Sequence, residues 1–147
     1  MGGRKFAITD ENPASIWTMT LPVATDSGAA VGAVTGATKV FSDLSTAGFT
    51  KAKENLGFEG VTWHSATNTF YAVQEMSPTA LFKVSGDGAT VTTVTADLKT
   101  QGMLISGALT RSGDATDELF VIIKEPKGIH RINISTGLST AGMKRAV

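Results

Sequence analysis

Carboxylates recur at one place in the pattern of this chain, and a repeated acid can serve a metal ion or a substrate. Glu11, Glu75 and Glu125 each follow a short apolar run and precede a turn that contains proline. The same carboxylate can instead accept hydrogen bonds from the backbone of its own turn, and its repetition favours this structural role. Glu75 is the best functional candidate of the three because a further acid, Glu59, lies in the same unit of the pattern.

Glu59 lies between Phe58 and Gly60 in the predicted strand FEGVTW. Calcium takes six to eight oxygen ligands, often carboxylates and carbonyls. This preference makes Glu59, Glu75 and Asn55 the candidate ligands of a calcium site. The alternative is that Glu59 is a solvated residue at a strand end or pairs with a basic neighbour.

Other catalytic groups are sparse. His64 and His130 are the only histidines, so a site with three histidines on zinc is excluded within one chain. Each can act as a base or a ligand, but ordinary turn and strand positions are favoured. Cysteine is absent, and the sequence has no GxSxG, P-loop or GxGxxG motif. No catalytic residue is therefore assigned.

The sequence pattern predicts that these residues lie on or beside short strands. Runs of β-branched and aromatic residues alternate with clusters rich in Gly, Asp, Asn and Ser, which is typical of strands joined by turns. With 41% apolar residues the 147-residue chain can build a core, and we expect Trp63 and Phe70 to be core residues between neighbouring sheets. Basic and acidic residues balance at thirteen each, which disfavours nucleic-acid binding. No apolar run reaches the roughly 20 residues of a membrane span.

Self-comparison of the sequence reveals three copies of one unit, a strand, a Glu, a Pro-containing turn and a second strand. Two copies are preceded by a strand with Gly in its third place, and an outer strand type follows at Val40–Leu44 and Val94–Leu98. This order predicts an all-β fold of four-stranded antiparallel meanders, the blades of a β-propeller, at about residues 5–48, 55–99 and 103–147. The first blade is expected to lack its inner strand. A β-sandwich with chance similarity is the alternative. The three copies are FAITDENPASIWTM, FYAVQEMSPTALFKV and LFVIIKEPKGIHRI, and the two preceding strands are FEGVTW and ISGALT.

The stretch from Asn55 to Val84, NLGFEGVTWHSATNTFYAVQEMSPTALFKV, resembles the SdiA-regulated family of bacterial six-bladed propellers and the related phytase-like propellers. The resemblance implies a calcium-associated, periplasmic or extracellular protein, although the first residues show no signal-peptide pattern. It also implies that Glu59 and Glu75 match the recurring acidic positions of the family.

Two functions follow as hypotheses. The favoured one is a half-propeller binding or structural module that is associated with calcium and closes a ring as a homodimer, because about three blades fall below the four to eight of a closed propeller. The alternative is a calcium-dependent phosphoester or lactone hydrolase that uses Glu59 and Glu75 on the metal. The absence of a convincing base and of a Lys/Arg cluster for a phosphate-rich substrate favours the module.

Overall fold

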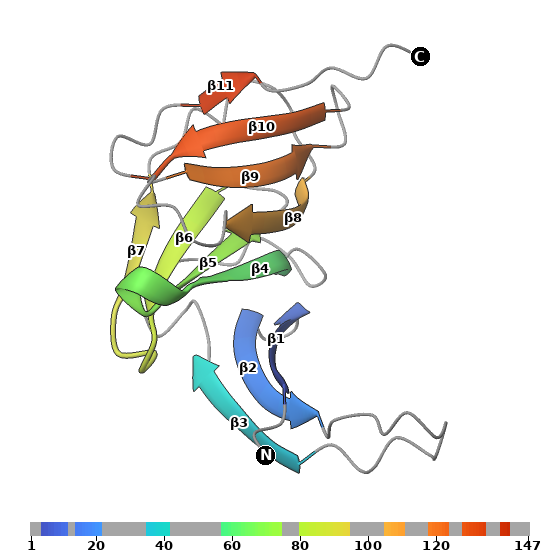
Figure 1. Cartoon of the computed structure of the whole chain (residues 1–147), viewed down its shortest axis with the longest axis vertical. Helices are drawn as coiled ribbons and strands as arrows, with labels where there is room; N and C mark the ends of the chain where they lie inside the picture. Colours follow the sequence, from blue (N-terminus) through green and yellow to red (C-terminus); the bar gives the residue numbers. More distant parts are fainter. Residues whose placement is uncertain are drawn as a thin grey trace.

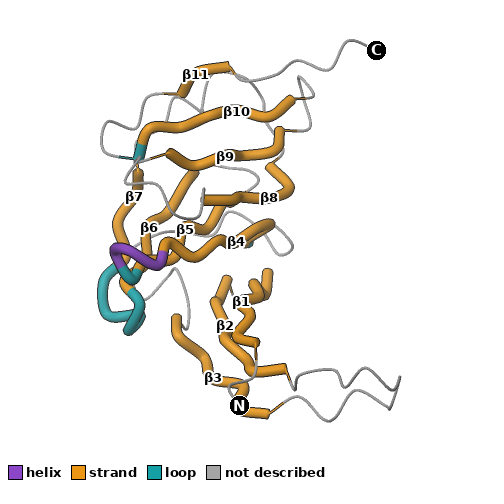
Figure 2. Tube along the Cα trace, in the orientation of Figure 1, coloured by secondary structure: helices purple, strands orange, loops and turns teal. Residues whose placement is uncertain are grey.

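The computed structural model is almost entirely β-structure. It describes residues 4–11, 14–21, 35–41, 57–74, 80–94, 105–110, 118–123, 128–134 and 139–141. These residues form three antiparallel sheets stacked in series, with the second sheet between the first and the third (Figure 1). Outside the strands, the described residues comprise the helical turn η2 (Ser65–Thr67) and short loops (Figure 2). The all-β prediction is confirmed.

Each sheet is an up-and-down meander in which strands adjacent in the chain pair with each other. The first sheet contains β1 (Arg4–Glu11), β2 (Ala14–Leu21) and β3 (Thr35–Phe41). The second contains β4 (Phe58–His64), β5 (Thr69–Gln74), β6 (Ala80–Ser85) and β7 (Val91–Val94). The third contains β8 (Ile105–Thr110), β9 (Glu118–Ile123), β10 (Gly128–Asn133) and β11 (Ser139–Ala141).

The sheets are propeller blades, and the chain holds about half a propeller. Among the described residues the first sheet has three strands, which correspond in sequence to the last three strands of the other two sheets. β4, the inner strand of the second sheet, packs against β8, the inner strand of the third sheet, and against β1, the first described strand of the first sheet.

The described outer strands begin before the ranges that the sequence pattern predicts. β3 is described from Thr35 to Phe41 and β7 from Val91 to Val94, whereas the predicted strands were Val40–Leu44 and Val94–Leu98. The β6–β7 turn explains the second shift: the N–H of Gly88 donates to the carbonyl of Ser85 at 2.8 Å, and Val84 then pairs with Val91. Because this turn is short, the next strand begins as early as Val91. Residues 42–44 and 95–98 lie outside the described part of the chain.

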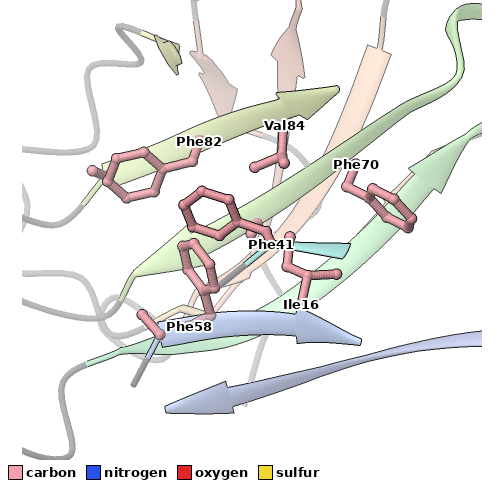
Figure 3. Packing of buried hydrophobic residues seen from close by; sticks show 9 residues of the cluster. Ile16, Phe41, Phe58, Phe70, Phe82 and Val84 are labelled. Atoms are coloured by element: carbon pink, nitrogen blue, oxygen red, sulfur yellow. The ribbon is translucent and has the colours of Figure 1, made fainter. Parts of the chain in front are cut away.

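Two hydrophobic clusters hold the three sheets together, one on each face of the second sheet. Every residue of β5 is buried, because successive side chains point to opposite faces and both faces are covered. The first cluster joins the first and second sheets and contains Ile16, Phe41, Phe58, Phe70, Phe82 and Val84 (Figure 3), with Ala14, Ala72 and Ala80. The second joins the second and third sheets and contains Tyr71, Val73, Leu81, Leu119, Val121 and Ile132.

Of the two aromatic residues predicted for the core, one is buried and the other is partly exposed. Phe70 is buried, with 4% of its surface exposed, but Trp63 is 38% exposed, so its prediction as a core residue was wrong. The Trp63 ring lies on Phe70, with ring centroids 4.5 Å apart, on the face toward the first sheet. Trp63 is near the end of β4, where it lines a cavity between the two sheets instead of a packed core.

Candidate functional site

The predicted acid Glu59 lies on the inner strand β4, at a β-bulge. Phe58 pairs with Gln74 and Gly60 with Val73, so Glu59 has no residue opposite it in β5. A bulge bends a strand and redirects a side chain, and bulges are frequent beside functional sites. Glu59 is half-buried at this point.

The same irregularity recurs in the inner strand of the third sheet. Ile105 pairs with Ile123 and Gly107 with Ile122, which leaves Ser106 as the extra residue of β8. Gly60 and Gly107 follow the bulges directly, which explains why glycine occupies the third place of both inner-strand sequences. The repeated bulge places Glu59 and Ser106 at equivalent positions of neighbouring blades.

The end of β1 approaches the start of β4 beside Glu59. A Cβ atom on Gly57 would overlap the backbone of Glu11, which is the last residue of β1. Glu11 is itself half-buried and lies opposite Ala14 at the turn into β2. The first of the recurring glutamates is therefore the last residue of a strand.

Glu75 and Asn55, the other two predicted calcium ligands, lie outside the described residues. The described positions nearest to them are Gln74 and Gly57, and Gln74 lies opposite Phe58. Within the ranges that the structure describes, no group of three or more His, Asp or Glu side chains is placed to hold a metal ion. The calcium site and the hydrolase hypothesis both stay predictions.

His64 has a local structural role. It is buried, and its Nδ1 shares a hydrogen bond of 2.7 Å with Oγ1 of Thr67. This contact spans η2, and the turn ends at Asn68 in the left-handed conformation with φ of 51°. The imidazole edge also faces the ring of Tyr71, with centroids 6.5 Å apart. The His130 side chain lies outside the described residues.

The outer face of the first sheet carries several large apolar side chains together with Asp10 and Lys39, and the sequence pattern does not distinguish the apolar residues from a core. Ala7 and Ile16 point toward the second sheet, so the alternate residues point away from it. Phe6 is 42% and Ile8 45% exposed on that outer side. They lie opposite Met19 and Trp17, and the Lys39 ammonium lies 4.7 Å from the centroid of the Trp17 ring. We call these residues the first end face: Phe6, Ile8, Asp10, Trp17, Met19 and Lys39.

The outer face of the third sheet forms the opposite end of the stack. Leu119, Val121 and Ile132 point toward the second sheet, so Phe120, Ile129 and Arg131 are on the outer side. Ile129 is 37% exposed, and Arg131 forms an ion pair with Glu118 at 3.4 Å. We call these residues the second end face: Glu118, Phe120, Ile129 and Arg131.

Comparison with known proteins agrees with the blade architecture. A family model described as SdiA-regulated matches residues 1–140. The chain belongs to the SdiA-regulated family. The match covers all three sheets up to Thr140 in β11, whereas the resemblance seen in the sequence is strong in one blade only. No curated protein and no solved structure matches this SdiA-regulated chain. Among its described residues, no helix is long and apolar enough to cross a membrane.

Proposed function

We propose that this SdiA-regulated chain is a half-propeller binding and structural module that closes a ring by pairing with a second copy of itself. The observation that carries the proposal is the pair of apolar end faces. Phe6, Ile8 and Ile129 expose more than a third of their surface there, at the places where a propeller has its next blade. Burial of such side chains against a neighbouring sheet is the main driving force for association.

A second copy is the occupant that fits both end faces at once. In a ring with a twofold axis, the first end face of each chain packs on the second end face of the other. Two identical interfaces then cover all four faces. Each face also carries charged side chains, with Asp10 and Lys39 on the first face and the Glu118–Arg131 pair on the second. Twofold dimers are also the commonest oligomers.

Charge substitutions at the two end faces test this arrangement. Ile8→Glu and Ile129→Lys each place a charge in both interfaces of the homodimer, and we expect the dimer Kd to rise by at least about a hundredfold. A mixture of the two variants should regain dimer, because one interface is then unsubstituted and the other brings Glu opposite Lys. Thr92→Glu is the matched control, since Thr92 is exposed on β7 of the middle sheet.

Two results would contradict the proposal. If both single variants associate like the parent chain, the end faces are not the interface. If mixing restores nothing, the faces do not meet each other, and a face that pairs with its own copy or with a different protein is the better explanation.

The calcium site of the proposal is formed by Glu59, Glu75 and Asn55 on the axial side of the second sheet. Support comes from the bulge that sets Glu59 on the inner strand and from the position of Gln74, the residue before Glu75, opposite Phe58. The three side chains offer only oxygen donors, which suits calcium. These residues would hold the ion beside the inner strand β4, and the ion would offset the negative charge of Glu59 and Glu75 there.

A thermal unfolding experiment tests the calcium site. An ion that binds only the folded state stabilises it by RT ln(1 + [L]/Kd), about 2.7 kcal/mol at a hundredfold excess over Kd. We expect calcium to raise the Tm of the parent chain and of Asp87→Asn, the control at a carboxylate in the β6–β7 turn, but not of Glu59→Gln. Equal Tm values for the parent chain in millimolar calcium and in chelator would refute the site.

A further inference from the structure

A cavity of about 580 Å³ separates the first and second sheets at the end where Trp63 lies. Its volume falls in the range of small-molecule sites. One wall is the inward face of the first sheet and the other is the region of the second sheet around the β4–β5 turn. The described lining includes Lys5, Thr18, Thr20 and Thr38 on the first wall and Trp63, Asn68 and Phe70 on the second. Phe6 and Met19, whose side chains belong to the first end face, also contribute atoms to the first wall.

The two walls differ in chemistry. On the second wall the Trp63 indole lies against Phe70 and is 38% exposed, so it offers an aromatic surface beside the core cluster of Phe70. On the first wall Lys5 lies opposite Thr20, and Thr18 lies opposite Thr38 in the next strand. These side chains are on the same face as Ile16, which points into the core toward the second sheet.

Lys5 gives the cavity a single sign of charge. Among the described lining residues it is the only charged side chain, and it forms no ion pair with the described part of the chain. A lysine ammonium donates charge-assisted hydrogen bonds to carboxylates, and threonine hydroxyls add neutral ones. An aromatic surface with a cation and hydroxyl groups on the facing wall is complementary to a flat apolar molecule with one anionic group.

We propose that this cavity binds a small flat carboxylate, with its ring on Trp63 and its carboxylate at Lys5. The site lies within one chain, so it does not depend on ring closure or on the calcium site. It assigns to Trp63 and Lys5 a binding role that explains why a large aromatic side chain stays exposed between two sheets.

Naphthalene compounds of one shape and different charge provide the test on the full-length protein. The probes are 1-naphthoate, its neutral counterpart 1-naphthamide, and the cation 1-naphthylmethylammonium. The chain has two tryptophans, so two indole N–H signals are expected in the proton–nitrogen NMR spectrum, and Trp17→Phe assigns them. We expect 1-naphthoate to shift the Trp63 signal saturably, the amide to bind about tenfold more weakly, and the cation more weakly still.

Variants then separate the two walls. Lys5→Gln should weaken 1-naphthoate about tenfold and leave 1-naphthamide unchanged, whereas Lys39→Gln, the matched lysine on the outer side of the same sheet, should leave both unchanged. Trp63→Leu should weaken both probes, with circular dichroism to show that the sheets remain. The proposal is wrong if no probe shifts Trp63 at millimolar concentration, if acid and amide bind equally, or if Lys39→Gln has the effect expected of Lys5→Gln.

Discussion

Replacing Phe58 by alanine should destabilise the chain more than any change at Trp63. Phe58 is 1% exposed at the start of β4, and its ring contacts Phe82 edge-on at 5.7 Å and Phe41 at 6.2 Å between centroids. Phe41 belongs to the first sheet and Phe82 to the second, so Phe58 lies at the contact between two blades. Loss of a buried phenylalanine side chain costs about 3–5 kcal/mol, which includes the aromatic contacts and the cavity left behind.

Urea unfolding at one fixed protein concentration measures this cost, because association would otherwise change the apparent stability. Trp63→Ala is the matched aromatic control on the same strand. With 38% of its surface exposed, its removal should cost about 1–2 kcal/mol. Where Phe58→Ala fails to fold, Phe58→Leu should still fold and lose about 1.5 kcal/mol. A loss for Trp63→Ala equal to or above that for Phe58→Ala would refute the blade packing described here.

Two further predictions concern the β6–β7 turn. Gly88 has φ of +73°, and a Cβ atom added there would overlap the Val40 carbonyl of the first sheet, so Gly88→Ala should cost more than about 2 kcal/mol in urea unfolding. Gly36→Ala, at φ of +65° with nothing within 4 Å, should cost only the backbone strain of about 1 kcal/mol. Equal losses would show that the turn does not contact Val40. The hydrogen bonds from the Ser85 hydroxyl and the Ala89 N–H lower the pKa of Asp87 below its usual 3.8. The ionised carboxylate therefore stabilises the fold at pH values above 3.8, and this contribution is lost as the pH falls through the lowered pKa. The stability difference between the parent chain and Asp87→Asn should therefore shrink in acid, and a difference that grows in acid would contradict the contact.

The blade architecture was predictable because each blade repeats the same short sequence pattern. The aromatic strand, the glutamate and the proline turn recur in three copies, and the glycine in the third place of FEGVTW and ISGALT marks the bulge that the two inner strands share. Such signals depend on residues near each other in the chain, so a sequence carries them directly. Glu59 was placed on an inner strand for the same reason.

The role of Trp63 was not predictable in this way. Trp63 pairs with Phe70 and shares its face, but the apolar pattern of the two strands does not say how far the neighbouring sheet extends along that face. The same limit applies to Phe6 and Ile8. Their alternate positions in an apolar strand are typical of a core face, although both side chains are more than 40% exposed. Cavities and end faces arise from the placement of whole sheets, which local patterning does not encode.

The mass of the dilute, folded protein in solution shows whether two copies close a ring. Sedimentation equilibrium over a dilution series, with circular dichroism to confirm β-structure, distinguishes a two-chain ring from an isolated half-propeller. We expect a species of twice the 15.3 kDa chain mass that persists at low micromolar concentration and shifts to monomer in Ile8→Glu. A well-folded 15.3 kDa monomer at every concentration would contradict ring closure by a second copy.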